Sequence, residues 1–358
     1  MALPAQILES QINDFTRAMV AKTSPQLTDV FTPQHPIYTQ MEKHGGVISE
    51  NPGRGPVRDI EYARVRRTKK SSRTKQTIER EKGDSQTTTA AQFDWVMCTN
   101  TLFVNKYIFL NTQGGDAQLK YIKERMDARD SDMKIQLVED LWSGDTVGTT
   151  PQFGIKDFIQ TTPTADPARG AVGGISVVDV PTWANQYANF NAAYATYVTG
   201  AQTLTFLDSG VNSLGSLYRR CSNNPEGQSA EGQPNMIAAN EAFIRFCEGL
   251  ARAGLLRQDG NEVRDFGIEG FRYKNSVIYW DQDCPDSPGS SSYGIAYLLN
   301  TRVMQLVWAK GLQRLMSPQI VEQTDGGYSW DITSQYCVVI RDRRRQGVMY
   351  DVKEATAS

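Results

Sequence analysis

The longest uninterrupted pattern of apolar and polar positions runs from residue 116 to residue 143. It contains no glycine or proline, and its apolar side chains recur at steps of three, four and seven residues. They are Leu119, Ile122, Met126, Met133, Leu137 and Leu141. These steps place one apolar stripe on an α-helix, and Asp116 precedes Lys120 in the favourable i,i+4 order. Because Gly144 follows as a C-cap, the pattern predicts a helix over 116–143, about 42 Å long, lying over a sheet.

Shorter apolar runs predict the remaining elements. β-forming residues alternate roughly with charged ones over 57–65, and apolar residues recur over 93–109. With a turn near Ser71–Ser72, this arrangement predicts a long β-hairpin whose second strand continues into the body of the protein. Further strands are predicted over 271–280, 295–299 and 336–340, helices over 183–197 and 236–254, and a short strand or helix over 303–315.

The first fifty residues have too little apolar periodicity for a domain of their own. One amphipathic helix is predicted over 7–19. Beyond it, Pro25, Pro33, Pro36 and the Gly45–Gly46 pair predict an extended chain. A segment of this kind is ordered by lying against something else, so we expect an arm.

The composition is that of a folded protein. Of 358 residues, 39% are hydrophobic and 9% aromatic, which suits two domains or one large one. The five cysteines include no CxxC pair, so we expect a reducing compartment and neither a zinc site nor a disulfide framework. The N-terminus lacks a signal-peptide pattern. No segment approaches about 18 uninterrupted apolar residues, and we expect no membrane partner.

The charge is unevenly distributed. Residues 54–82 carry eleven Lys or Arg and four Asp or Glu, a net charge of +7 in a chain of net charge −2, so the remainder carries −9. The candidate docking residues of this hairpin are Arg64, Arg66, Arg67, Lys69, Lys70, Arg73 and Lys75. They lack the interleaved aromatics of a single-strand binder, so a protein–protein docking surface is favoured. Nucleic-acid binding and a merely solvated hairpin remain alternatives.

The sequence contains no recognisable catalytic constellation, and no enzyme, cofactor or metal is expected. The two histidines, His35 and His44, both fall in the irregular arm, where solvated loop histidines are the ordinary case. Asp281, Asp283 and Asp286 lie close together in one loop but lack the glycine and distal glutamate of a calcium loop. We therefore expect an acidic surface loop.

Several short phrases occur in a characteristic order. They are LWSGD at 141–145, FGIKD at 153–157, GIS at 174–176, TWA at 182–184, GF at 270–271, VIYWD at 277–281, IAYLLN at 295–300 and RRRQG at 343–347. In this order and spacing, and with the arm, hairpin and long helix before them, the chain resembles the major capsid proteins of tailed double-stranded DNA bacteriophages.

The resemblance implies an α+β fold, the tailed-phage major capsid fold. The expected parts are an N-terminal arm (1–53), an extended β-hairpin loop (54–100), a peripheral domain (101–147) with the spine helix (116–143), an axial domain (148–330), and a closing strand, peripheral or axial, with a C-terminal tail (331–358). The six apolar positions of the spine helix would hold the peripheral sheet.

The resemblance also implies a function. The chain would be a structural subunit that self-assembles into hexamers and pentamers of an icosahedral shell around packaged double-stranded DNA. It would reside in the virion after assembly in the host cytoplasm. A separate scaffolding protein, a portal and a decoration protein are candidate partners, with non-specific contact to DNA. An encapsulin-type compartment and a basic-hairpin nucleic-acid-binding protein are the alternatives.

Overall fold

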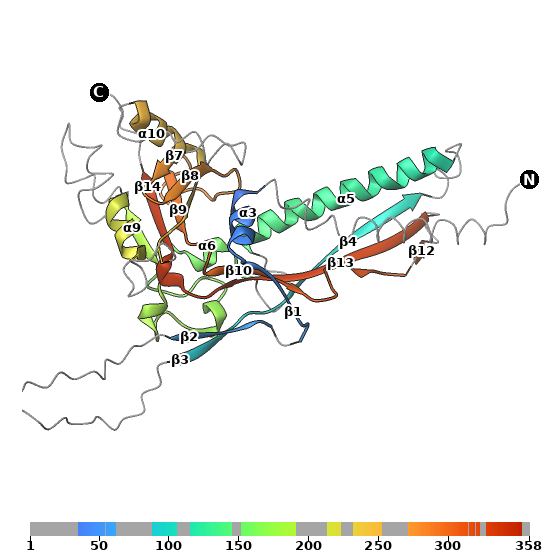
Figure 1. Cartoon of the computed structure of the whole chain (residues 1–358), viewed down its shortest axis with the longest axis horizontal. Helices are drawn as coiled ribbons and strands as arrows, with labels where there is room; N and C mark the ends of the chain where they lie inside the picture. Colours follow the sequence, from blue (N-terminus) through green and yellow to red (C-terminus); the bar gives the residue numbers. More distant parts are fainter. Residues whose placement is uncertain are drawn as a thin grey trace, which may run out of the picture.

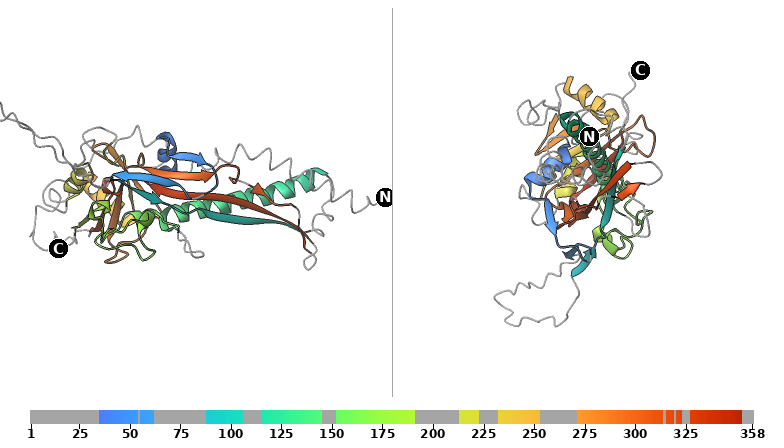
Figure 2. Two further views of the ribbon diagram at one scale, coloured as in Figure 1. Left: turned by 90° about the horizontal axis from the view of Figure 1, so that it is seen from below. Right: turned by 90° about the vertical axis from the view of Figure 1, so that its right-hand side faces the viewer.

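Two lobes of unequal thickness make up the molecule (Figure 1). The computed structural model describes residues 35–53, 55–61, 88–105, 115–144, 152–190, 213–222, 232–252, 271–313, 315–318, 320–322 and 327–352. Helix α5 (Gly115–Ser143) and strands β4 (Val96–Asn105) and β13 (Gly327–Ile340) run together into the thinner lobe (Figure 2). The described strands form two six-stranded sheets and one two-stranded ribbon.

Helix α5 begins one residue before the predicted range and ends where predicted. Met126, Met133, Leu137 and Leu141 are buried, whereas the side chains of Leu119 and Ile122 lie outside the described part of the structure. Toward the far end of the helix, Met126 packs with Leu102, Val104, Tyr328 and Trp330 of β4 and β13. At this end of the helix the apolar stripe faces the sheet, as the periodicity indicates, while Leu137 and Leu141 pack in the main core.

The first sheet is organised around β13. Strand β4 pairs with it antiparallel over ten positions, from Val96 opposite Tyr336 to Asn105 opposite Gly327. The other edge of β13 pairs in turn with β10 (Met304–Ala309), β11 (Leu315–Met316) and β12 (Ile320–Glu322). Strand β1 (Val47–Glu50) adds to β10 in parallel.

The second sheet lies in the thicker lobe. Its order is β5 (Gln186–Asn189), β14 (Gly347–Val352), β9 (Gly294–Leu299), β6 (Met236–Ala239), β8 (Ser276–Trp280) and β7 (Phe271–Tyr273). One face packs against α9 (Leu214–Ser222) and α10 (Glu241–Arg252), through Leu217 and Phe243 among others. The opposite face contributes Tyr279 and Tyr297 to the main core.

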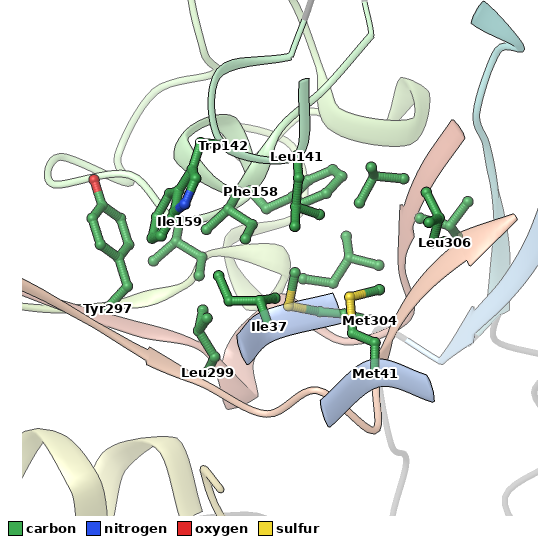
Figure 3. Packing of buried hydrophobic residues seen from close by; sticks show 14 of the residues in the cluster. Ile37, Met41, Leu141, Trp142, Phe158, Ile159, Tyr297, Leu299, Met304 and Leu306 are labelled. Carbon is green, nitrogen blue, oxygen red and sulfur yellow. The ribbon is translucent and has the colours of Figure 1, made fainter. Parts of the chain in front are cut away.

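The main core joins both sheets (Figure 3). Leu306 comes from the first sheet and Leu299 from the second, and Trp142 enters from the end of α5. Helix α3 (Pro36–Lys43) adds Ile37 and Met41, both fully buried. Short helices α6 (Ile155–Phe158), η1 (Val172–Gly174), η2 (Pro181–Trp183) and η4 (Arg343–Arg345) surround this core.

Three expected elements differ from the structure. The prolines were expected to keep residues 33–36 extended, yet Pro36 begins α3, because the first helical position needs no N–H donor. Residues 186–189 and 236–239 were expected to be helical but are strands β5 and β6. All four residues of β6 are buried, and a short, fully buried strand has the same continuous apolar pattern as a buried helix.

Strand pairing does not follow the expected domain limits, which remain predictions. Strands β10, β11 and β12 fall within 148–330, the stretch expected to be axial, but they pair with β13 and so belong to the sheet of β4. The closing segment 331–358 is divided, since β13 lies in the first sheet and β14 in the second. The expected limits differ from the strand pairing because the chain returns, after β9, from the thicker lobe to the thinner one. No helix among the described residues is long and apolar enough to cross a membrane.

Candidate assembly interface

A two-stranded ribbon projects from the body at the base of the predicted hairpin (Figure 1). Strands β2 (Val57–Glu61) and β3 (Thr88–Gln92) pair antiparallel, with Val57 opposite Gln92. Ile60 and Ala91 of the ribbon are buried in the main core. The Arg58 side chain donates to the Gln305 Oε1 atom (2.9 Å) and pairs with Glu50. The base of the ribbon is therefore fixed to the first sheet.

The seven basic candidate residues, Arg64 to Lys75, lie outside the described part of the chain. Their docking role stays a prediction. The described structure places the two strands that lead to and from them side by side, with Glu61 opposite Thr88 and 26 residues of sequence between the two.

The outer face of β4 is exposed at Met97, Thr99 and Thr101, and the β13 residues Asp331, Thr333 and Gln335 opposite them are half-buried. Met97, Thr99 and Thr101 of β4 point away from α5, because Asn100 on the other face donates to the Arg129 carbonyl oxygen of the helix (3.2 Å). Across the strands, the Thr101 hydroxyl donates to the Asp331 carboxylate (2.7 Å). Such cross-strand pairs stabilise the sheet, while the face itself remains available for contact.

Large apolar side chains are exposed at several separate places. They are Val57, Met97, Ile135, Val178, Tyr187, Trp280, Leu315 and Ile320. These residues come from both sheets, the ribbon, the spine helix and a loop. Isolated exposed apolar residues are normal on soluble proteins, so none of them alone marks an interface.

The end of the spine helix is locked between the two sheets. Trp142 is buried, donates through Nε1 to the Asp281 Oδ2 atom (3.0 Å) and packs edge-on against Tyr297, with ring centroids 5.3 Å apart. Figure 3 shows both rings in the shared core. Gly144 then caps the helix with a φ of +63°. The two lobes are thereby connected by packed side chains as well as by the chain itself.

A buried arginine fastens the C-terminal part of the chain. Arg343 is fully buried, donates from Nε to the Phe158 carbonyl oxygen (2.8 Å) and lies over the Trp183 ring. Burial lowers the pKa of Arg343 to about 10, despite the nearby Asp166 and Asp157. Arg344 and Arg345 pair with Asp342. The basic phrase at 343–347 is therefore largely internal structure, which its composition alone does not reveal.

The burial of the two histidines and of the acidic loop differs in part from what the sequence predicts. His35 was expected in solvent, but only 12% of its side chain is exposed, and its Nε2 lies 3.2 Å from the buried Asp281 Oδ2 atom. Asp283 and Asp286 are exposed, as expected for a surface loop. His44 is half-buried, and burial lowers its pKa, with Arg302 and Lys43 acting in the same direction. Sequence patterns missed the His35–Asp281 contact because the two residues are far apart in the chain.

Comparison with known proteins places the fold. No family model matches the sequence, and no curated protein matches it. Among solved structures, the cyanophage A-1(L) capsid asymmetric unit matches with a TM-score of 0.56 at 15% identity, covering 89% of this chain and 94% of that one. The capsid of an empty GTA particle matches with a TM-score of 0.50 at 12% identity, covering 87% and 96%.

The chain thus has the tailed-phage capsid fold, an α+β arrangement, as the order of its phrases predicts. The holo-SrpI encapsulin of Synechococcus elongatus PCC 7942 is also similar, with a TM-score of 0.47 at 10% identity, covering 75% of this chain and 79% of that one.

Proposed function

We propose that this protein is the structural subunit of an icosahedral capsid, self-assembling into hexamers and pentamers around packaged double-stranded DNA. The observation that carries the proposal is the likeness to a capsid fold over 89% of this chain. The role is structural and non-enzymatic, and the assembled protein resides in the virion. The long helix and its sheet form the peripheral region, and the second sheet forms most of the axial region.

The ribbon supports this proposal. An isolated two-stranded ribbon is marginally stable, and the base formed by β2 and β3 leads into the most basic part of a chain that is otherwise acidic. Opposite charges on two copies of one chain favour their association. Closed symmetry then repeats the same contact many times, so that individually weak contacts add up.

Other partners follow from the same function. A separate scaffolding protein would set the size of the shell during assembly in the host cytoplasm, a portal would occupy one vertex, and a decoration protein would bind outside. Contact with DNA would be non-specific and electrostatic. Because Arg343 is buried and its two basic neighbours pair with Asp342, that phrase is a poor candidate for the DNA contact.

Electron microscopy of the purified full-length chain, alone and coexpressed with its genomic neighbours, tests the proposal. We expect closed shells, sheets or capsomers with fivefold and sixfold arrangements. A monodisperse monomer under both conditions would contradict a shell function. Shells that retain one specific protein and exclude DNA would favour the encapsulin-type alternative, and a monomer that binds DNA with a steep salt dependence would favour the nucleic-acid alternative.

A further inference from the structure

Three side chains with metal-binding atoms converge beside the spine helix. His35 precedes α3, and Asp281 and Asp283 belong to the loop after β8. One ligand atom from each lies within 4.8 Å of the other two. Among the residues that the structure describes, no other group of three His, Cys, Asp or Glu side chains has this geometry. An imidazole and two carboxylates form a mixed donor set that differs from an ordinary acidic surface loop.

The His35 ring is poorly satisfied by the protein alone. Both of its nitrogens are buried, and neither has a hydrogen-bond partner among the described residues, although Nε2 lies 3.2 Å from Asp281 Oδ2. Burying a polar nitrogen without a partner is unfavourable. Two ligands of one metal ion approach each other to a similar distance without bonding to each other, because each directs a lone pair at the ion.

Asp281 is held in one orientation by its surroundings. Its Oδ2 atom accepts from the Trp142 indole (3.0 Å), and its Oδ1 atom accepts from the Asp283 backbone N–H (3.0 Å). Hydrogen bonds of this kind are typical of the groups that orient metal ligands. Asp283, by contrast, is exposed and lines a surface pocket of about 530 Å³ together with His35. The pocket gives an ion and its remaining water ligands a route to solvent.

We propose that His35, Asp281 and Asp283 bind a divalent transition-metal ion, with Zn²⁺ the best match. Imidazole nitrogen and carboxylate oxygen suit Zn²⁺ and its neighbours in the first transition row, whereas Ca²⁺ and Mg²⁺ favour oxygen alone. The ion joins the segment before α3 to the loop after β8 and, through Asp281 and Trp142, to the end of α5. It acts as a structural clamp on the N-terminal segment. The proposal is independent of whether the protein forms a shell.

The test titrates Zn²⁺ into the EDTA-treated full-length chain and follows the imidazole nitrogens by NMR. The chain has two histidines, so His44 serves as an internal reference. We expect one equivalent of Zn²⁺ to shift the Nε2 resonance of a single histidine, and Co²⁺ to give visible d–d absorption bands. The shift should disappear in His35→Gln and persist in His44→Gln.

A matched pair in the acidic loop supplies the control. Asp283→Asn removes a proposed ligand, and Asp286→Asn removes an exposed carboxylate outside the cluster. We expect Asp283→Asn to weaken Zn²⁺ binding by about tenfold or more and Asp286→Asn to leave it unchanged. The proposal is overturned if the wild-type chain binds no Zn²⁺, if the nitrogen resonances of His35 do not change when Zn²⁺ is added, or if both loop variants bind equally. Asp283 is exposed, so its variant keeps the test decisive even if His35→Gln fails to fold.

Discussion

Replacing Gly144 by alanine should destabilise the junction at the end of the spine helix. Gly144 has a φ of +63°, a left-handed conformation that costs an L-residue about 1–2 kcal/mol. A Cβ atom there would overlap the Gln152 carbonyl oxygen and lie 2.7 Å from the Gly154 nitrogen. Both are backbone atoms, so no side-chain rotation relieves the overlap.

Gly45 provides a matched control, because it also follows a helix. Its φ is +69°, but a Cβ atom there would meet nothing within 4 Å. Gly45→Ala should therefore cost only the backbone term of about 1–2 kcal/mol. Gly144→Ala adds about 1–3 kcal/mol for overpacking, which gives a total of about 2–5 kcal/mol. At about 2 °C per kcal/mol for a chain of this size, Tm should fall by about 2–4 °C and about 4–10 °C respectively.

Thermal unfolding of the unassembled chain, followed by tryptophan fluorescence, measures both changes. Trp142 lies two residues from Gly144 and is buried, and it contributes to this signal as one of the six tryptophans of the chain. Equal losses in the two variants would refute the reasoning, since the close approach to Gln152 and Gly154 would then contribute nothing. An unchanged Tm for Gly144→Ala would refute the backbone argument as well.

Two further predictions concern the spine helix and the hairpin. Leu137 is 5% exposed and Ile135 57%, so Leu137→Asp should bury an unpaired carboxylate, cost several kcal/mol and give insoluble protein, while Ile135→Asp should stay soluble. The soluble fraction and circular dichroism measure this, and a soluble, folded Leu137→Asp variant would contradict the assigned helix orientation. Neutralising the hairpin should impair assembly but not folding, because the +7 charge is proposed to dock on an acidic neighbour. The positions changed to serine are Arg64, Arg66, Arg67, Lys69, Lys70 and Arg73. Replacing only the four arginines by lysine is the control, and normal particle yield from the serine variant would show that these charges are incidental.

Local patterns were sufficient to predict the spine helix. Its 28 residues contain repeated apolar spacing, acid–base pairs and a terminal glycine, and all of these act within one helix. The observed element, Gly115–Ser143, differs by one residue. The base of the hairpin was predicted only in part. Strand β2 lies in the alternating stretch 57–65, but its partner β3 (Thr88–Gln92) precedes the expected apolar run, and β4 within that run pairs with β13.

Long-range pairing was harder to predict. Only residues 336–340 of β13 were expected as a strand, yet the strand begins at Gly327. Its first ten residues are ordered by pairing with β4, more than two hundred positions earlier in the chain. Ser329 and Ser334 are buried within it. Because these residues are polar, they interrupt the hydrophobic run by which a strand is predicted from sequence.

The candidate metal site was beyond sequence reasoning for the same physical reason. His35 and Asp281 come together only because α3 packs into the main core through Ile37 and Met41. A proline at the start of that helix and a Gly–Gly pair after it are equally compatible with an extended arm. Tertiary packing decided between the two conformations.

The shared core also determines how the molecule can deform. At the root of the thinner lobe, Trp142, Leu306 and Tyr297 lie in one continuous packed cluster that includes both sheets. Near its tip, α5 is held to β4 and β13 by a much smaller cluster around Met126 and Trp330. The lobe is therefore anchored by many side chains at its root and by few at its tip. In the proposed shell, a load applied by an adjoining copy would displace the tip more readily than the root, so differences in curvature between neighbouring copies would be taken up along the length of the lobe.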